Sequence, residues 1–216
     1  MVALALWRWV LVRGMRTPAL VGLFLALLGG IPLIQSLQPL PRPGGAVDLA
    51  LSWSFPAALV GVSAALGELS RARDFLVRLE RDTRLGLELG ALALAGTILQ
   101  LPTLGGALLS GAGAADLGLS PLAILHCSLR LASLALVLLA LPLTTVSRVG
   151  LFLAAAWMLP ALASGLPPLQ RATAWLDARP AHFHAAPADL VSLVPALALV
   201  LAARLLRTSP LRGTSE

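Results

Sequence analysis

Apolar residues come in long runs along this chain, and short polar segments separate them. Six runs are long enough for a helix that crosses a bilayer, which takes roughly 20 residues. The pattern predicts an all-α integral membrane protein with six transmembrane helices in a single domain. The expected spans cover about residues 18–37, 46–67, 85–110, 130–147, 149–166 and 188–203.

Residues 1–17 predict a different kind of helix. Apolar residues, among them Trp7, mix here with Arg8, Arg13 and Arg16, and the three arginines share about 140° of a helical wheel. This is typical of a helix in the membrane interface, with Trp towards the acyl chains and Arg towards the phosphates. A signal peptide is the alternative, but no Ala-x-Ala site closes the apolar run that follows.

The fourth span has two alternative positions. Apolar residues run from Leu119 to Thr145, but His126 and Arg130 interrupt them. One long helix would bury Arg130 at mid-span, which costs about 2.5–3.5 kcal/mol on insertion scales. We prefer a helix from about Arg130 to Ser147, with roughly 17 residues to cross. His126 and Arg130 then line a polar pathway or anchor the interface, and the anchor is favoured.

Six crossings assign every loop to one of two sides, and arginine is unevenly divided between them. Only three, Arg42, Arg171 and Arg179, fall on one side. The other side, cytoplasmic by the positive-inside rule, also holds both chain ends. Its twelve are Arg8, Arg13, Arg16, Arg71, Arg73, Arg78, Arg81, Arg84, Arg148, Arg204, Arg207 and Arg212.

Residues 68–84 (ELSRARDFLVRLERDTR) are the most charged stretch of the chain. Their spacing predicts an amphipathic cytoplasmic helix with a Glu68–Arg71 ion pair. A topogenic charge cluster that stops transfer is one interpretation, and a helix that docks a cytoplasmic partner is the other. The apolar face comprises Leu69, Ala72, Leu76 and Leu79, and the charged face comprises Arg71, Asp74, Arg78 and Arg81.

The composition agrees with a membrane protein. Hydrophobic residues make up 58% of the 216 residues, charged residues only 12%, and the mean hydropathy is +0.88. Soluble domains carry about 25% charged residues, so this chain needs lipid as the solvent for its surplus apolar surface. The net charge of +6 does not predict nucleic-acid binding, because the arginines flank the apolar runs.

Missing residue types exclude several kinds of chemistry. The chain has no Lys, Asn or Tyr, and all 16 basic residues are Arg, a bias typical of a GC-rich bacterial genome. Without Lys there is no nucleotide-binding P-loop and no Schiff base. The single Cys127 permits no disulfide and no Cys-x-x-Cys pair. We expect no enzyme activity and no cofactor, and another chain must bind any ATP.

Two further motifs have weak chemical signals. His182 and His184 are spaced for a metal site, but an ordinary loop explains them better. Gly61-Val62-Ser63, with His126 as base, resembles an intramembrane protease setting, but helix packing is the better interpretation.

The order of these elements resembles the membrane subunits of type-2 ABC exporters. Those subunits have an interfacial helix, then six spans with both ends inside. A coupling helix between spans two and three docks on the ATPase, and a re-entrant element lies between spans five and six. The corresponding segments here are residues 1–17, 68–84 and 167–187, with loose matches to the family's cytoplasmic run at 65–70 (ALGELS) and 83–89 (TRLGLEL).

The resemblance implies a permease of the bacterial inner membrane that forms a homodimer or heterodimer. A separate ATPase subunit docks on each copy, and substrate moves outward through the dimer interface. Arg71, Asp74, Arg78 and Arg81 are then the docking residues. A secondary transporter or channel-like bundle and a non-transporting scaffold are the alternatives; against the first, the spans hold almost no acidic residues, and Glu88 is the candidate for a relay.

Overall fold

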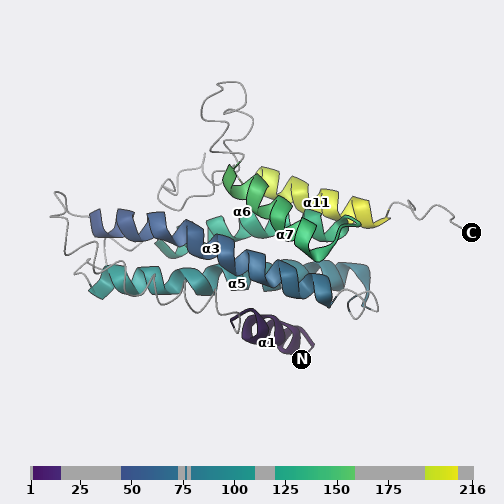
Figure 1. Cartoon of the computed structure of the whole chain (residues 1–216), viewed down its shortest axis with the longest axis horizontal. Coiled ribbons are helices and arrows are strands. Elements are labelled where there is room, and N and C mark those ends of the chain that lie inside the picture. Colours follow the sequence, from purple (N-terminus) through teal and green to yellow (C-terminus); the bar gives the residue numbers. More distant parts are fainter. Residues whose placement is uncertain are drawn as a thin grey trace, which may run out of the picture.

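All regular elements among the described residues are helices. The computed structural model describes residues 2–15, 45–72, 76, 79–109, 120–158 and 193–208, which confirms the all-helical class for this part of the chain. The helices are α1 (Val2–Met15), α3 (Gly45–Arg71), α5 (Arg81–Leu109), α6 (Ser120–Ala140), α7 (Thr145–Leu153), the π-helical turn η1 (Ala154–Met158) and α11 (Val194–Thr208) (Figure 1).

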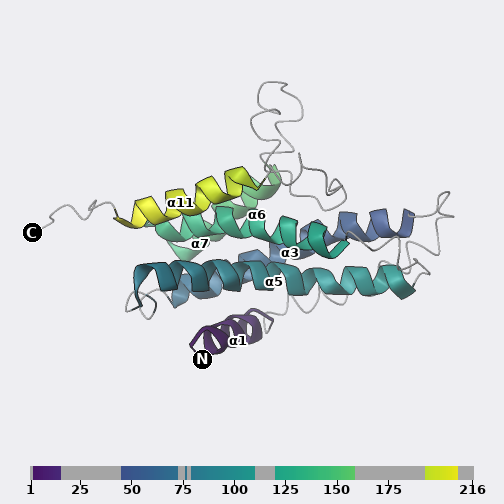
Figure 2. The same ribbon diagram turned by 180° about the vertical axis from the view of Figure 1, so that it is seen from behind.

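The helices α3 and α5 form an antiparallel pair at the centre of the bundle. The helix α6 packs on both of them, α7 packs on α3, and α11 packs on α6, while α1 lies on the outer side of the α3–α5 pair (Figures 1 and 2). The helices α3, α6 and α11 end at one end of the bundle, and α5 and α7 begin at that same end. This end is the right-hand end in Figure 1.

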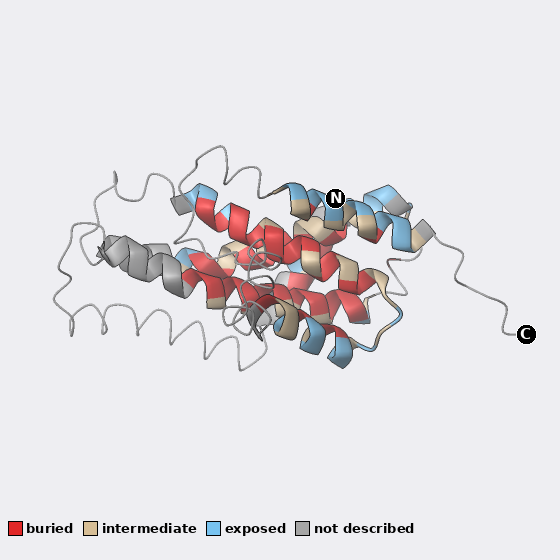
Figure 3. Cartoon of the chain, turned by 90° about the horizontal axis from the view of Figure 1, so that it is seen from above, coloured by how far each residue is buried: buried red, intermediate tan, exposed pale blue. Residues whose placement is uncertain are grey.

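The core runs along the contact between α3, α5 and α6, where most residues are buried (Figure 3). Glycines bring these helices close together. A Cβ at Gly61 would lie 2.5 Å from the Ala95 carbonyl oxygen, and one at Gly96 would lie 3.0 Å from Val62 Cγ2. The Ser63 hydroxyl donates to the Leu59 carbonyl at 2.7 Å. Gly61 is therefore a packing residue of α3, while the Ser63 hydroxyl is bonded within its own helix.

Two helices in the described part of the chain are long and apolar enough to cross a membrane. They are Asp82–Pro102 of α5 and Pro121–Ala140 of α6, while the apolar helix Thr145–Ala156 is shorter. The length and composition of these two helices suit a membrane protein, although buried helices of soluble proteins share such properties. Six spans stay a prediction, and the expected first span at 18–37 and loop at 167–187 lie outside the described residues.

The limits predicted for the fourth span were wrong. The segment 130–147 is not one helix, because α6 ends at Ala140 and α7 starts at Thr145. Pro142 stands in the turn, and the Ser147 N–H donates to Thr144 Oγ1 at 3.2 Å, which caps α7. Arg130 therefore lies in the middle of α6. Its side chain is only 7% exposed, so the protein covers it, whereas the predicted insertion cost assumed lipid around it.

The segment 68–84 is not one helix either. Its first residues belong to the end of α3, Leu79 and Glu80 are not helical, and α5 starts at Arg81. A helix of 17 residues is about 25 Å long, whereas packed helix axes lie about 8–10 Å apart. The antiparallel packing of α3 and α5 therefore requires the break. The four apolar residues do pack on the core, since Leu69 and Leu76 are buried and Ala72 and Leu79 are half-buried against it, but they do not form a face of one helix.

The N-terminal helix was predicted correctly as a helix, and its Arg8 and Arg13 are exposed. The orientation of Trp7 was wrong. Its Nε1–H donates to the Leu87 carbonyl at 3.1 Å, and the ring occupies the space beside Gly90, where a Cβ would lie 2.6 Å from Trp7 Cζ2. Because Gly90 has no side chain, there is space for the indole on the surface of α5, and Trp7 fills it. Trp7 therefore faces the protein.

Candidate functional site

Basic side chains gather at the end of the bundle where α5 and α7 begin, which we call the arginine end. Residues far apart in sequence meet there because α3, α6 and α11 finish at the same level. All of these arginines were assigned to one side of the bundle from the sequence. The members with described side chains are Arg71 on α3, Arg84 on α5, Arg148 on α7, and Arg204 and Arg207 on α11.

A buried carboxylate joins α5 to α11 at the arginine end. Glu88 is 1% exposed. Arg84 Nε donates to its Oε1 at 2.8 Å, and Arg207 Nη2 donates to its Oε2 at 2.5 Å. One carboxylate thus holds two guanidinium groups, and both of its oxygens accept a charge-assisted hydrogen bond. Sequence reasoning missed this pair because Arg207 lies 119 residues from Glu88.

A second ion pair between the same helices is exposed. Arg204 Nη2 lies 2.9 Å from Asp82 Oδ2, and the two side chains are 51% and 62% exposed. Water and salt screen such a pair, so it contributes at most about 1 kcal/mol. The buried Glu88 cluster is therefore the main polar connection between α11 and α5.

Arg148 closes the end of α6. It is 2% exposed, although it stands near the start of α7. Its Nε donates to the Leu138 carbonyl at 3.1 Å, and its Nη2 donates to the Leu141 carbonyl at 2.9 Å. These carbonyls lie at and just beyond the C-terminus of α6, where a cation also complements the helix dipole. Arg148 therefore acts as a cap that holds the α6–α7 turn.

The structure does not bring the four predicted docking residues onto one helical face. Arg71 is the last residue of α3, its side chain is 66% exposed, and it forms the predicted ion pair with Glu68. Arg81 is the first residue of α5, and its side chain lies outside the described part. Asp74 and Arg78 also lie outside the described residues.

His126 and Arg130 do not belong to the arginine end. They lie one turn apart on α6, and both are 7% exposed. Arg130 stands ten residues before the end of α6 at Ala140. The two residues are thus buried within the middle of the bundle. Their predicted roles, a polar pathway or an interface anchor, stay hypotheses.

A group of uncharged polar side chains joins α5 to α6. Gln100 Nε2 donates to Ser128 Oγ at 2.8 Å and to the Gly96 carbonyl at 3.1 Å. Thr97 Oγ1 donates to the same Ser128 oxygen at 3.0 Å. Interhelical hydrogen bonds of this kind stabilise apolar bundles by about 0.6 kcal/mol on average. Polar residues within the apolar runs were the signal in the sequence, but only the packing paired them.

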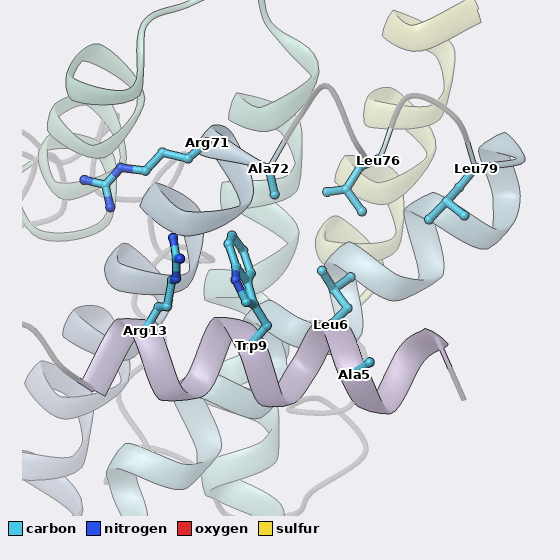
Figure 4. Close-up of a pocket in the computed structure, with 8 residues that line it drawn as sticks. All are labelled: Ala5, Leu6, Trp9, Arg13, Arg71, Ala72, Leu76 and Leu79. Carbon is cyan, nitrogen blue, oxygen red and sulfur yellow. The ribbon is translucent and has the colours of Figure 1, made fainter.

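Two cavities flank Arg71. One of about 530 Å³ lies between α1, the end of α3 and the segment that follows it (Figure 4). The other, of about 480 Å³, lies between the end of α3 and the start of α7, with Ser63, Glu68 and Val149 among its lining residues. Arg71 thus stands between two spaces that a ligand or a partner side chain can enter.

Metal chemistry has no basis in the described residues, which contain no group of three or more His, Cys, Asp and Glu side chains that could hold a metal ion. The pair His182 and His184 lies outside this part of the chain. Comparisons with protein-family models, curated proteins and solved structures found no match. The geometry of the arginine end is therefore the basis for a functional proposal.

Proposed function

We propose that this chain is the membrane-embedded permease subunit of an ATP-driven exporter, and that a separate ATPase docks at the arginine end. In this proposal six helices cross a bacterial inner membrane, both chain ends are cytoplasmic, and two permease copies form the transport unit. The observation that carries the proposal is the arginine end itself, where Arg71 is exposed on the connection between two antiparallel core helices.

The outward face of α11 supports membrane insertion. Val194, Leu197, Leu201 and Leu205 recur at steps of three and four residues, and each is between 58% and 65% exposed. Such spacing places them on one stripe of the helix. A stripe of exposed branched apolar side chains is costly in water and suits lipid or a second permease copy.

The connection between α3 and α5 is a reasonable place for a partner to apply force. Leu69 near the end of α3 and Leu76 on the connection are both buried in the core, so a force on Leu76 reaches the packed helices. The Glu88 cluster then ties the start of α5 to α11. A displacement of the connection by a docked ATPase is therefore passed to α3, α5 and α11 together.

Glu88 is a poor candidate for the acidic group of an ion-coupled transporter. Such a transporter needs an acidic group that can bind and release its ion during the cycle. Both oxygens of Glu88 accept hydrogen bonds from arginine, so this carboxylate already has two cationic partners. A non-transporting scaffold is the alternative that the experiments below separate from a permease.

Single cysteines test the orientation. In a Cys127→Ser background, Glu80→Cys places a thiol at the arginine end and Pro121→Cys places one at the start of α6; both native residues are exposed. A membrane-impermeant maleimide added to intact cells should label only Pro121→Cys, and inverted vesicles should expose Glu80→Cys. Labelling of both thiols from one side would overturn the proposed topology.

Copurification tests the docking. The full chain isolated from its native membranes should carry a subunit with a P-loop and should hydrolyse ATP. Arg71→Glu combined with Arg78→Glu should lower the copurified ATPase activity by about tenfold, which corresponds to roughly 1.4 kcal/mol of binding. Arg8→Glu, an exposed change on α1, is the control. Intact chain without an ATPase would favour the scaffold, and equal activity in all variants would refute docking at this segment.

A further inference from the structure

The cavity between α1 and the end of α3 has a charged part and an apolar part (Figure 4). Arg13 and Arg71 lie at one end of it, while Leu6, Leu76 and Leu79 lie towards the other, and Trp9 stands between them. Its volume of about 530 Å³ falls within the range of roughly 300–1,000 Å³ that is usual for small-molecule sites. The cavity therefore suits an elongated ligand with a polar head and an apolar tail.

The charged part carries two guanidinium groups. The Arg13 guanidinium carbon lies 5.1 Å from the centroid of the Trp9 ring, and this stacking orients the group without using its N–H donors. Arg71 forms an ion pair with Glu68 through Nη1, and its side chain is 66% exposed. No described residue that lines the cavity is acidic. The head of the ligand is therefore expected to be an anion that accepts hydrogen bonds from guanidinium groups, such as a phosphodiester.

A small anion has no apolar surface that could cover the apolar part of the cavity. Leu6 and Leu76 are 7% and 0% exposed, so core contacts already cover them, whereas Trp9, Ala72 and Leu79 are only half-buried. A free phosphate ion would contact the arginines and leave the accessible apolar surface of Trp9, Ala72 and Leu79 uncovered. An acyl chain would cover that surface. The proposed position of the arginine end, at the cytoplasmic leaflet, is where anionic lipids are abundant.

We propose that this cavity binds one anionic phospholipid. The phosphate lies between Arg13 and Arg71, and an acyl chain lies along Trp9, Ala72 and Leu79. The proposal rests on the cytoplasmic position proposed above for the arginine end, but Arg13, which is not among the proposed docking residues, distinguishes lipid binding from ATPase docking. The lipid would fasten α1 to the connection between α3 and α5.

Native mass spectrometry of the full chain, released from detergent micelles and titrated with lipid, tests the head group. Dioleoyl phosphatidylglycerol should bind about tenfold more tightly than dioleoyl phosphatidylcholine. Arg13→Gln and Arg71→Gln should each lower the affinity for phosphatidylglycerol by about tenfold. Arg8→Gln removes the same charge from an exposed site on α1 that does not line the cavity, and it should have no effect. Equal binding of both lipids, or an equal loss with Arg8→Gln, would overturn the proposal.

A second set of binding measurements tests the position of the acyl chain. Leu79→Ser should weaken binding of dioleoyl phosphatidylglycerol but not of its dihexanoyl analogue, whose short chains bury less apolar surface. Millimolar inorganic phosphate should not displace the dioleoyl lipid; displacement would show a phosphate site and refute the lipid. Arg13 is exposed and forms no described ion pair, so Arg13→Gln should fold. Unchanged lipid binding by this folded variant would also refute the proposal.

Discussion

The first turns of α5 hold two other helices in different ways. The C-terminal helix α11 is attached by charge, through Arg207 and Arg204. The N-terminal helix α1 is attached by shape, because Trp7 fills the space beside Gly90 and donates one hydrogen bond to the α5 backbone. Both attachments lie within residues 82–90, so they share the same helix and nearly the same depth in the bundle.

The two attachments are expected to respond to different kinds of substitution. A buried ion cluster is costly to break, because the remaining charges stay in a medium that solvates them poorly. Loss of the Trp7 ring beside Gly90 leaves no unpaired charge. The fit of this ring is, however, sensitive to a single methyl group added at Gly90. The α11 attachment should therefore respond most to removal of a charge, and the α1 attachment most to a change of volume.

The largest effect is expected for Glu88→Ala. This change leaves Arg84 and Arg207, whose side chains are 15% and 10% exposed, without their carboxylate, and it should lower the free energy of unfolding by about 3–5 kcal/mol. Equilibrium unfolding of the full chain in micelles measures it. Replacing Glu88, Arg84 and Arg207 by Met together should restore most of the stability. A loss below about 1 kcal/mol for Glu88→Ala would show that charge does not hold α11.

Gly90→Ala should have the next largest effect. The new Cβ would lie 2.6 Å from the Trp7 ring, so α1 must shift, at a cost of about 1–3 kcal/mol. Gly86→Ala is the matched control on the same helix, since a Cβ there meets no atom within 4 Å; it should stabilise α5 by about 0.5–1 kcal/mol. The same unfolding measurement applies. Equal effects of the two changes would show that the fit of the Trp7 ring beside Gly90 does not hold α1.

Trp7→Phe should have a smaller effect that separates the ring from its hydrogen bond. Phenylalanine keeps an aromatic ring near Gly90 but has no donor for the Leu87 carbonyl, which should cost about 0.5–1.5 kcal/mol. Limited proteolysis within α1 reports its local release. A loss as large as that of Trp7→Ala would show that the hydrogen bond, and not the ring, holds α1.

Arg204→Gln should have the smallest effect. Its pair with Asp82 is exposed at both ends, so the loss should be below about 1 kcal/mol and should fade as salt is raised to about 1 M, where the Debye length is near 3 Å. Arg207→Gln at the buried cluster should cost more at every salt concentration. Equal costs for the two changes would contradict the distinction between exposed and buried pairs.

Local patterns in the sequence predicted several features correctly. The helix at the N-terminus, the burial of Leu69 and Leu76, and the ion pair between Glu68 and Arg71 all follow from spacings of three and four residues. The break between α6 and α7 also has a local signal in the sequence, because Pro142 is followed closely by Thr144, the N-cap residue of α7. The prediction missed it because both positions considered for the fourth span ran through residues 141–145.

The sequence by itself thus determined that the described residues form apolar helices, and that one end of the bundle holds Arg71, Arg84, Arg148, Arg204 and Arg207. Only the tertiary structure decided that the segment 68–84 is broken and not one helix, that Trp7 turns inward, and that Glu88 takes Arg207 as its partner. The physical reason is distance along the chain. Neighbours one turn apart are set by helix geometry, whereas partners 80 and 119 residues apart meet only when the helices have packed.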